Sequence, residues 1–248
     1  DSIAVVRLVF FWGFFLGFGA CLTSSGHAQE TEPETEPETG GALRDHITFL
    51  STFDGTTTAN IARGDGRLFT AKNRRNFDEA TPGLHDPNVV LAKGRGLAGD
   101  ALEFKKKKRL LTFYNAQGNV AYSSNSWSGC VSFWLQLDPA KDLEPGFCDP
   151  IQITDSAYND AAIWVDFTKD NPRDFRLGII GDLQSWNPDK LPPDKNPGFE
   201  SRLITVTQPP FARGKWTHVL INFSGLNSDR GKSEFFIDGV LKGSLDVE

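Results

Sequence analysis

The sequence predicts an all-β fold of two packed antiparallel sheets, and three observations support this prediction. Residues 131–137 and 216–223 each alternate apolar and polar side chains with the period of a half-buried strand. An Asp-Gly pair, Asp238 and Gly239, lies between apolar residues, which is the pattern of a two-residue hairpin. No comparable stretch shows a sustained helical period, and clusters of Asn, Asp, Pro and Gly separate the short apolar runs.

The alternation also predicts which side chains form the core. Phe133 and Leu135 share one face of the first strand, and Val219, Ile221 and Phe223 share one face of the second. We expect all five to be buried, each contributing about 1.5 to 3 kcal/mol. Further short strands are predicted at residues 163–167, 175–180 and 203–207.

The Asp-Gly pair predicts the register of the hairpin that it closes. A type I′ turn sets Ile237 opposite Val240 and Phe236 opposite Leu241, because its twist matches that of the two strands. Large apolar side chains occur on both faces of this hairpin. We therefore expect it to be covered by other parts of the fold and not to lie at a bare edge.

Residues 1–28 have the order of a secretory signal peptide: Arg7, an apolar run at residues 8–20, then small residues leading to Ala28. The run is shorter than the roughly 20 residues of a spanning helix, so no transmembrane span is predicted. A second interpretation stays open, in which Cys21 is lipidated as in bacterial lipoproteins. Both interpretations predict a secreted or cell-surface protein.

Residues 29–44 form an acidic linker rich in Thr, Glu and Pro, which we expect to be disordered because it has almost nothing apolar to bury. Of the chain's 32 acidic and 26 basic residues, six and two precede Asp45, so residues 45–248 carry 26 and 24. This near balance argues against a nucleic-acid partner. The basic cluster at residues 105–109 is interpreted as a solvated turn between strands.

Several motifs together resemble the laminin G-like domains of the concanavalin A-like lectin/glucanase superfamily. They lie at residues 53–55, which match the opening strand of these domains, and at residues 99–104, 132–139, 214–219 and 236–243. The resemblance implies a jelly-roll sandwich over residues 45–248. It also implies truncation at the C-terminus, because members of this family continue with further strands after the hairpin. The superfamily contains lectins, glycosidases and adhesion modules, so the fold does not decide the function.

The sequence offers no catalytic residues. Glycosidases of this fold carry Glu-x-Asp-x-Glu on one strand, and residues 244–248 have Ser244 where the first Glu belongs. Glu234 and Asp238 are four apart on a strand, which separates them by about 13 Å, too far for a retaining pair. A glycoside hydrolase of the same fold remains the alternative. His218 is interpreted as a surface or hydrogen-bonded structural histidine and not as a metal ligand.

Calcium is the one metal that the sequence suggests. Carboxylate and carbonyl oxygens near strand ends are ligands that calcium takes, although the same residue types also form turns. The candidates are Asp149, Asp155, Asn159 and Asp160. Cys130 and Cys148 each begin a predicted strand, and a simple hairpin would hold them too far apart for a disulfide. Their pairing stays open.

Residues 182–189 form the predicted ligand-binding loop. Trp186 offers a ring on which a sugar can stack, and Asp182, Gln184 and Asn187 offer hydrogen bonds to its hydroxyl groups. The alternative is that Trp186 packs beneath its own loop. We therefore expect an exported, noncatalytic recognition module for carbohydrate or another cell-surface ligand, with a glycan or a surface protein as partner. A structural or adhesion domain of a longer surface protein is the further alternative.

Overall fold

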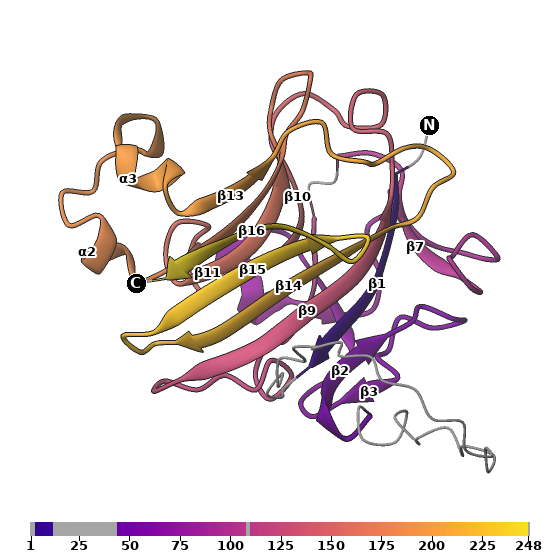
Figure 1. Cartoon of the computed structure of the whole chain (residues 1–248). Helices are drawn as coiled ribbons and strands as arrows, with labels where there is room; N and C mark the ends of the chain where they lie inside the picture. The colour runs from indigo at the N-terminus through magenta and orange to yellow at the C-terminus, as the bar shows by residue number, and fades with distance from the viewer. Residues whose placement is uncertain (1–2, 12–43, 108–109, 248) are drawn as a thin grey trace, which may run out of the picture.

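A computed structural model describes residues 3–11, 44–107 and 110–247. These residues form antiparallel β-sheets joined by loops and a few short helices, which confirms the prediction of a mostly-β protein (Figure 1). The described strands make sheets of nine, four and three strands, where two sheets were expected.

The largest sheet follows the order β16-β15-β14-β9-β1-β2-β3, and β7 and β6 branch from β1. All of its pairings are antiparallel. Its strands are β1 (Ile3–Phe11), β2 (Ile47–Ser51), β3 (Ile61–Ala62), β6 (Val89–Ala92), β7 (Ala101–Phe104), β9 (Trp127–Gln136), β14 (Thr217–Leu226), β15 (Gly231–Ile237) and β16 (Val240–Val247).

The four-stranded sheet has the order β10 (Cys148–Ile153), β11 (Ala162–Phe167), β12 (Phe175–Ile180) and β13 (Leu203–Val206). The three-stranded sheet has the order β5 (Thr81–Pro82), β4 (Leu68–Ala71) and β8 (Leu111–Tyr114). The short helices are α2 (Leu183–Trp186), α3 (Pro197–Glu200) and the 3-10 turns η1 (Arg74–Glu79) and η2 (Pro193–Lys195).

The main core lies between the large sheet and the four-stranded sheet. All five predicted core side chains are buried there, from Val219 and Ile221 at 0 % exposure to Phe223 at 4 %. Aromatic side chains of the opposite sheet meet them, and the rings of Phe175 in β12 and Phe235 in β15 lie 5.6 Å apart. The alternation of apolar residues therefore identified the inner face of each long strand correctly.

The predicted strands are all present, at β9, β11, β12, β13 and β14. Strands β11 and β12 are buried on both faces, because the segment holding α2 and α3 packs on the outer side of their sheet. The expectation of an opening strand at residues 53–55 is wrong. These residues form a turn after β2, in which Phe53 and Gly55 have φ values of 61° and 71°, outside the β region.

The predicted hairpin is confirmed in its register but not in its surroundings. Ile237 pairs with Val240 and Phe236 with Leu241 across a turn in which Asp238 and Gly239 have φ values of 49° and 76°. However, β16 is the last strand of the sheet, and Val240 and Leu241 are 56 % and 51 % exposed. A strand next to a turn at the end of a sheet has few neighbours that could cover it.

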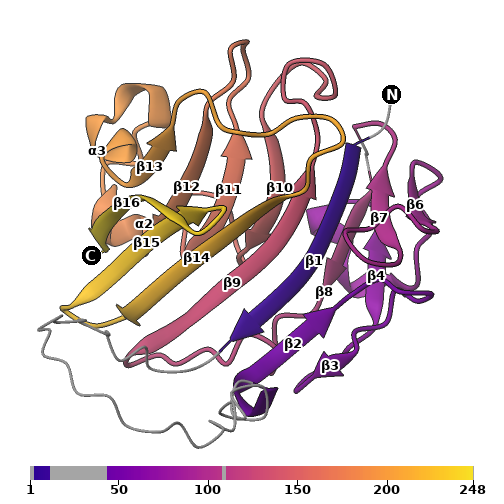
Figure 2. The same ribbon diagram turned by 45° about the vertical axis from the view of Figure 1, so that its right-hand side comes forward.

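The start of the predicted signal peptide forms a strand of the large sheet. Strand β1 lies between β9 on one edge and β2 and β7 on the other, as Figure 2 shows. Cleavage after Ala28 and lipidation at Cys21 remain predictions. Residues 12–43, which contain Cys21 and nearly all of the acidic linker, lie outside the described residues.

Candidate functional site

The four residues predicted to bind ligand lie together in and beside α2. The Asp182 carboxylate caps this helix by accepting a hydrogen bond from the Ser185 backbone N–H at 2.9 Å. Asn187 is 3 % exposed, and its side chain bonds Leu191 and the Asn196 side chain. Gln184 is exposed. Asp182 and Asn187 therefore stabilise the conformation of the loop through their side-chain hydrogen bonds.

Trp186 is half-buried in a small second core, with Phe199 of α3 and with Trp164 and other residues of the four-stranded sheet. Its ring lies 6.0 Å from that of Phe199, and the Arg202 guanidinium lies 5.2 Å from its centroid. Its indole N–H donates to the Asn159 carbonyl at 3.1 Å. These contacts are those of a packing residue, which is the alternative given above for Trp186. Ligand binding by this loop remains a prediction.

Of the calcium candidates, Asp149 lies in β10, and Asp155, Asn159 and Asp160 lie in the connection between β10 and β11. The Asp160 carboxylate accepts hydrogen bonds from Ser156 Oγ at 2.9 Å and from the Leu183 backbone N–H at 3.0 Å. Asp149 and Asp155 are exposed. Among residues 3–11, 44–107 and 110–247, no three His, Cys, Asp or Glu side chains cluster as a metal site requires. Cys130 and Cys148 lie in β9 and β10, which belong to different sheets, and no disulfide joins them.

A second candidate lies on the outer face of β9, β14 and β15. Because Val131, Phe133 and Leu135 point inward, the residues between them point outward. In Figure 2 these three strands lie in front of β11 and β12, and no helix crosses them. The side chains gathered there are half-buried, and we call their surface the Trp134 face: Ser132, Trp134, His218, Asn222 and Glu234.

Trp134 and His218 form the aromatic part of this face. They are paired across β9 and β14, and their ring centroids lie 4.8 Å apart. Within the part of the chain that the structure describes, no hydrogen bond engages the Trp134 indole N–H. By contrast, the indole N–H groups of Trp127 and Trp164 donate to backbone carbonyls at 3.0 and 2.6 Å. Trp134 is half-buried, so part of its side chain remains accessible on this face.

His218 links this ring pair to a hydroxyl group. Its Nε2 lies 2.8 Å from Ser132 Oγ, and the two residues are 86 positions apart in the sequence. Burial lowers the pKa of His218, while the charge of Asp238 acts in the opposite direction. The imidazole is therefore neutral at pH 7. The Asp238 carboxylate itself accepts hydrogen bonds from the His218 backbone N–H and from Lys215 Nζ, each at 2.9 Å.

Asn222 and Glu234 form the polar part of the same face. Asn222 Nδ2 donates to Glu234 Oε2 at 2.8 Å, and Lys232 Nζ donates to Oε1 at 3.0 Å. The bond from Asn222, followed by that from Lys232, lowers the pKa of Glu234, so this carboxylate is ionised at neutral pH. Side chains held by such bonds on paired strands are pre-organised acceptors and donors.

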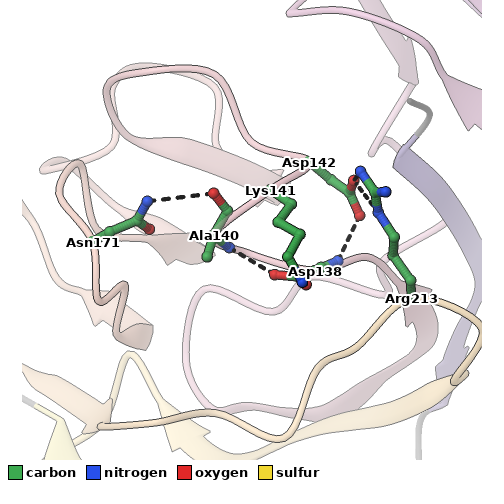
Figure 3. Close-up of polar contacts among 6 residues, drawn as sticks. All are labelled: Asp138, Ala140, Lys141, Asp142, Asn171 and Arg213. Carbon is green, nitrogen blue, oxygen red and sulfur yellow. Dashed lines mark hydrogen bonds and ion pairs between the residues drawn. The ribbon is translucent and has the colours of Figure 1, made fainter.

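The acidic turn after β9 is a structural clamp (Figure 3). The Asp142 carboxylate is nearly buried and accepts hydrogen bonds from the Asp138 backbone N–H at 2.7 Å and from the Arg213 guanidinium. Asp138 in turn accepts from Ala140 N and from Lys141 Nζ, and the Lys141 bond chiefly lowers the pKa of Asp138. The Asp142 carboxylate thus joins the loop after β9 to the loop before β14, whereas Asp138 stabilises its own loop.

The sequence analysis did not identify the Trp134 face. The alternation that marked Val131 and Phe133 as core also marks Trp134 as outward-facing, and it placed His218 opposite the core of its own strand. It did not indicate that β9 pairs with β14, because sequence pattern does not encode which distant strands are neighbours. That pairing alone brings Trp134 to His218.

Along the described residues, no helix is both long enough and apolar enough to cross a membrane. No protein-family profile, curated protein sequence or solved structure matches this chain.

Proposed function

We propose that this chain is an exported, noncatalytic recognition module of the concanavalin A-like, laminin G-like type, and that it binds carbohydrate on the Trp134 face. The single observation that supports this most is a half-buried, outward-facing tryptophan on β9, beside polar side chains held in fixed positions on β9, β14 and β15. Sugars stack their C–H faces on aromatic rings, and their hydroxyl groups need oriented partners.

The chemistry of the face suits a neutral or cationic sugar. Glu234 supplies an ionised acceptor, Asn222 supplies an amide, and the neutral His218 and Ser132 supply a bonded pair that can donate or accept. Because these groups lie on strands and not in loops, little conformational entropy is lost when they order around a ligand.

Two tryptophan variants, Trp134→Ala and Trp186→Ala, test the proposal. Screening against a glycan array, with and without calcium, identifies a binding oligosaccharide, and calorimetry then measures its affinity for each variant. Trp134→Ala should weaken binding at least about tenfold, since one stacking ring is worth on the order of 1.5 kcal/mol. It should leave the thermal midpoint almost unchanged.

Trp186→Ala is the matched control because Trp186 is also half-buried but packs in the second core. It should lower the thermal midpoint and keep the affinity. If Trp186→Ala abolishes binding while Trp134→Ala does not, the site belongs to the α2 loop that the sequence predicted, and the Trp134 face is not the platform.

A hydrolase is the second candidate, because the Ser132–His218 hydrogen bond has the geometry of a nucleophile and its base. Two features argue against it. First, the Asp238 carboxylate accepts a hydrogen bond from the backbone N–H of His218 and does not orient its ring. Second, an oxyanion hole needs free backbone N–H groups, and those of β9 and β14 are used in pairing with neighbouring strands. Labelling of Ser132 by a fluorophosphonate, lost in His218→Gln, would favour the hydrolase.

A further inference from the structure

Strand β1 is the only described connection between two halves of the large sheet. On one edge it pairs with β9, from Ala4 opposite Gln136 to Phe11 opposite Cys130. On its other edge, its first residues pair with β7 and its last residues pair with β2. Among the described pairings, none joins β9 directly to β2 or β7.

Removal of residues 1–28 would therefore open a slot inside the sheet. Strand β9 is ten residues long, and its inner side chains Val131, Phe133 and Leu135 are all 0 % exposed. Without β1, its backbone N–H and C=O groups on one edge would have no strand partner. A long edge strand with an apolar face is a template for pairing with another chain.

We propose that the slot between β9 and the β2/β7 edge is a strand-acceptor site, which binds an extended apolar peptide antiparallel to β9 once the predicted signal peptide is cleaved. This rests on the export part of the proposed function. The chain itself indicates the ligand chemistry: β1 reads Ile-Ala-Val-Val-Arg-Leu-Val-Phe-Phe, with Arg7 as its one charged residue. Arg7 falls in the register shift between Val5 and Leu8, where the pairing with β9 is interrupted.

The register predicts which positions of such a peptide must be apolar. Leu8 is paired with Phe133 on β9 and with Ser51 on β2, and both of these neighbours are fully buried. The next position, Val9, is paired with Ser132 and Leu50, which are both half-buried. A peptide bonded along both edges gains main-chain hydrogen bonds on two sides, and its alternate side chains supply selectivity.

The test begins with the full folded chain. A protease recognition sequence replaces part of the acidic linker at residues 29–41, and the protein is cleaved after folding. We expect the N-terminal fragment to remain bound through size-exclusion chromatography, as intact mass shows. Excess labelled peptide of residues 1–12 should then exchange into the slot, with fluorescence anisotropy as the measurement.

Two peptide variants serve as a matched pair. Leu8→Asp should bind at least about 100-fold more weakly, because the two residues paired with this position, Phe133 and Ser51, are fully buried and a charge among buried residues is costly. Val9→Asp should stay within about fivefold of the original. Equal binding of the two variants, or release of the fragment from a folded monomer, would overturn the proposal. Dimerisation or aggregation after release would also overturn it, since β9 edges would then pair with each other. The Trp134→Ala protein should bind the labelled peptide as the wild type does. A loss of glycan binding in this variant can therefore be told apart from a loss of peptide binding.

Discussion

Phe223 lies in the main core at 4 % exposure, and its ring packs edge-on against that of Trp127 at 4.7 Å. Truncation to alanine leaves a cavity that a close-packed interior fills only in part. We predict that Phe223→Ala lowers the free energy of unfolding by about 3 to 5 kcal/mol in chemical denaturation. Phe236→Ala, on the half-buried outer side of β15, is the control and should cost less than about 1.5 kcal/mol. Equal costs would mean that the two faces are assigned wrongly.

The His218 imidazole predicts a pH dependence of stability. Its pKa in the folded protein is lowered from the ordinary value of 6.5, first of all by burial. Below that value the unfolded chain binds more protons than the folded one, so the stability present above pH 6.5 is lost as the pH falls through the folded pKa.

The variant His218→Gln isolates this effect from the carboxylates that also titrate in acid. We predict that the difference in thermal midpoint between wild type and variant shrinks as the pH falls below about 6.5, because only the wild type loses the histidine contribution. A difference that is constant across this range would show that His218 titrates normally in the folded state.

At the scale of elements, β11 and β12 are joined by a buried ion pair as well as by their backbones. Arg176 donates to both carboxylate oxygens of Asp166, at 2.8 and 2.6 Å, and its guanidinium lies 5.3 Å from the Phe147 ring centroid. Burial works against the charged guanidinium, but the Asp166 bonds outweigh it and raise the pKa of Arg176. The pair occupies the outer face of a sheet that is covered on both sides.

Removal of one partner should therefore be costly. We predict that Asp166→Ala lowers the free energy of unfolding by about 3 to 5 kcal/mol, because it leaves the buried Arg176 guanidinium with only the exposed Glu200 carboxylate, 3.7 Å away, as an ion-pair partner. The pair of Asp65 and Arg67, whose side chains are 28 % and 59 % exposed, is the control, and Asp65→Ala should lower the thermal midpoint far less than Asp166→Ala. The double replacement Asp166→Leu with Arg176→Met should recover most of the loss. If it does not, the pair does more than neutralise its own charges.

At the scale of the whole molecule, local pattern predicted what depends on neighbours in the sequence. The inner face of β9 and β14 and the pairing of Ile237 with Val240 follow from alternation and from turn chemistry, and all were confirmed. The three-stranded sheet of β4, β5 and β8 was not predicted. Two of its strands have four residues and the third has two, too few for a period to be visible.

Long-range pairing accounts for most of what was missed. Ser132 and His218 meet across 86 residues, and β1 meets β9 across more than a hundred, so neither contact leaves a local trace in the sequence. The same limit applies to Trp186: the sequence left both a binding platform and a packing role open, because Phe199 and the Asn159 carbonyl, which contact its side chain, come from other segments. The Trp134 face was therefore visible only once the strands were paired.

The most direct test of the central claim is the indole region of a ¹H–¹⁵N NMR spectrum during titration with the oligosaccharide identified on the array. Trp134→Phe assigns the Trp134 resonance, and the bonded indoles of Trp127, Trp164 and Trp186 serve as internal references. We predict that the Trp134 indole signal shifts with ligand concentration while these three stay in place. A shift of the Trp186 signal with a stationary Trp134 signal would contradict the assignment of the binding site.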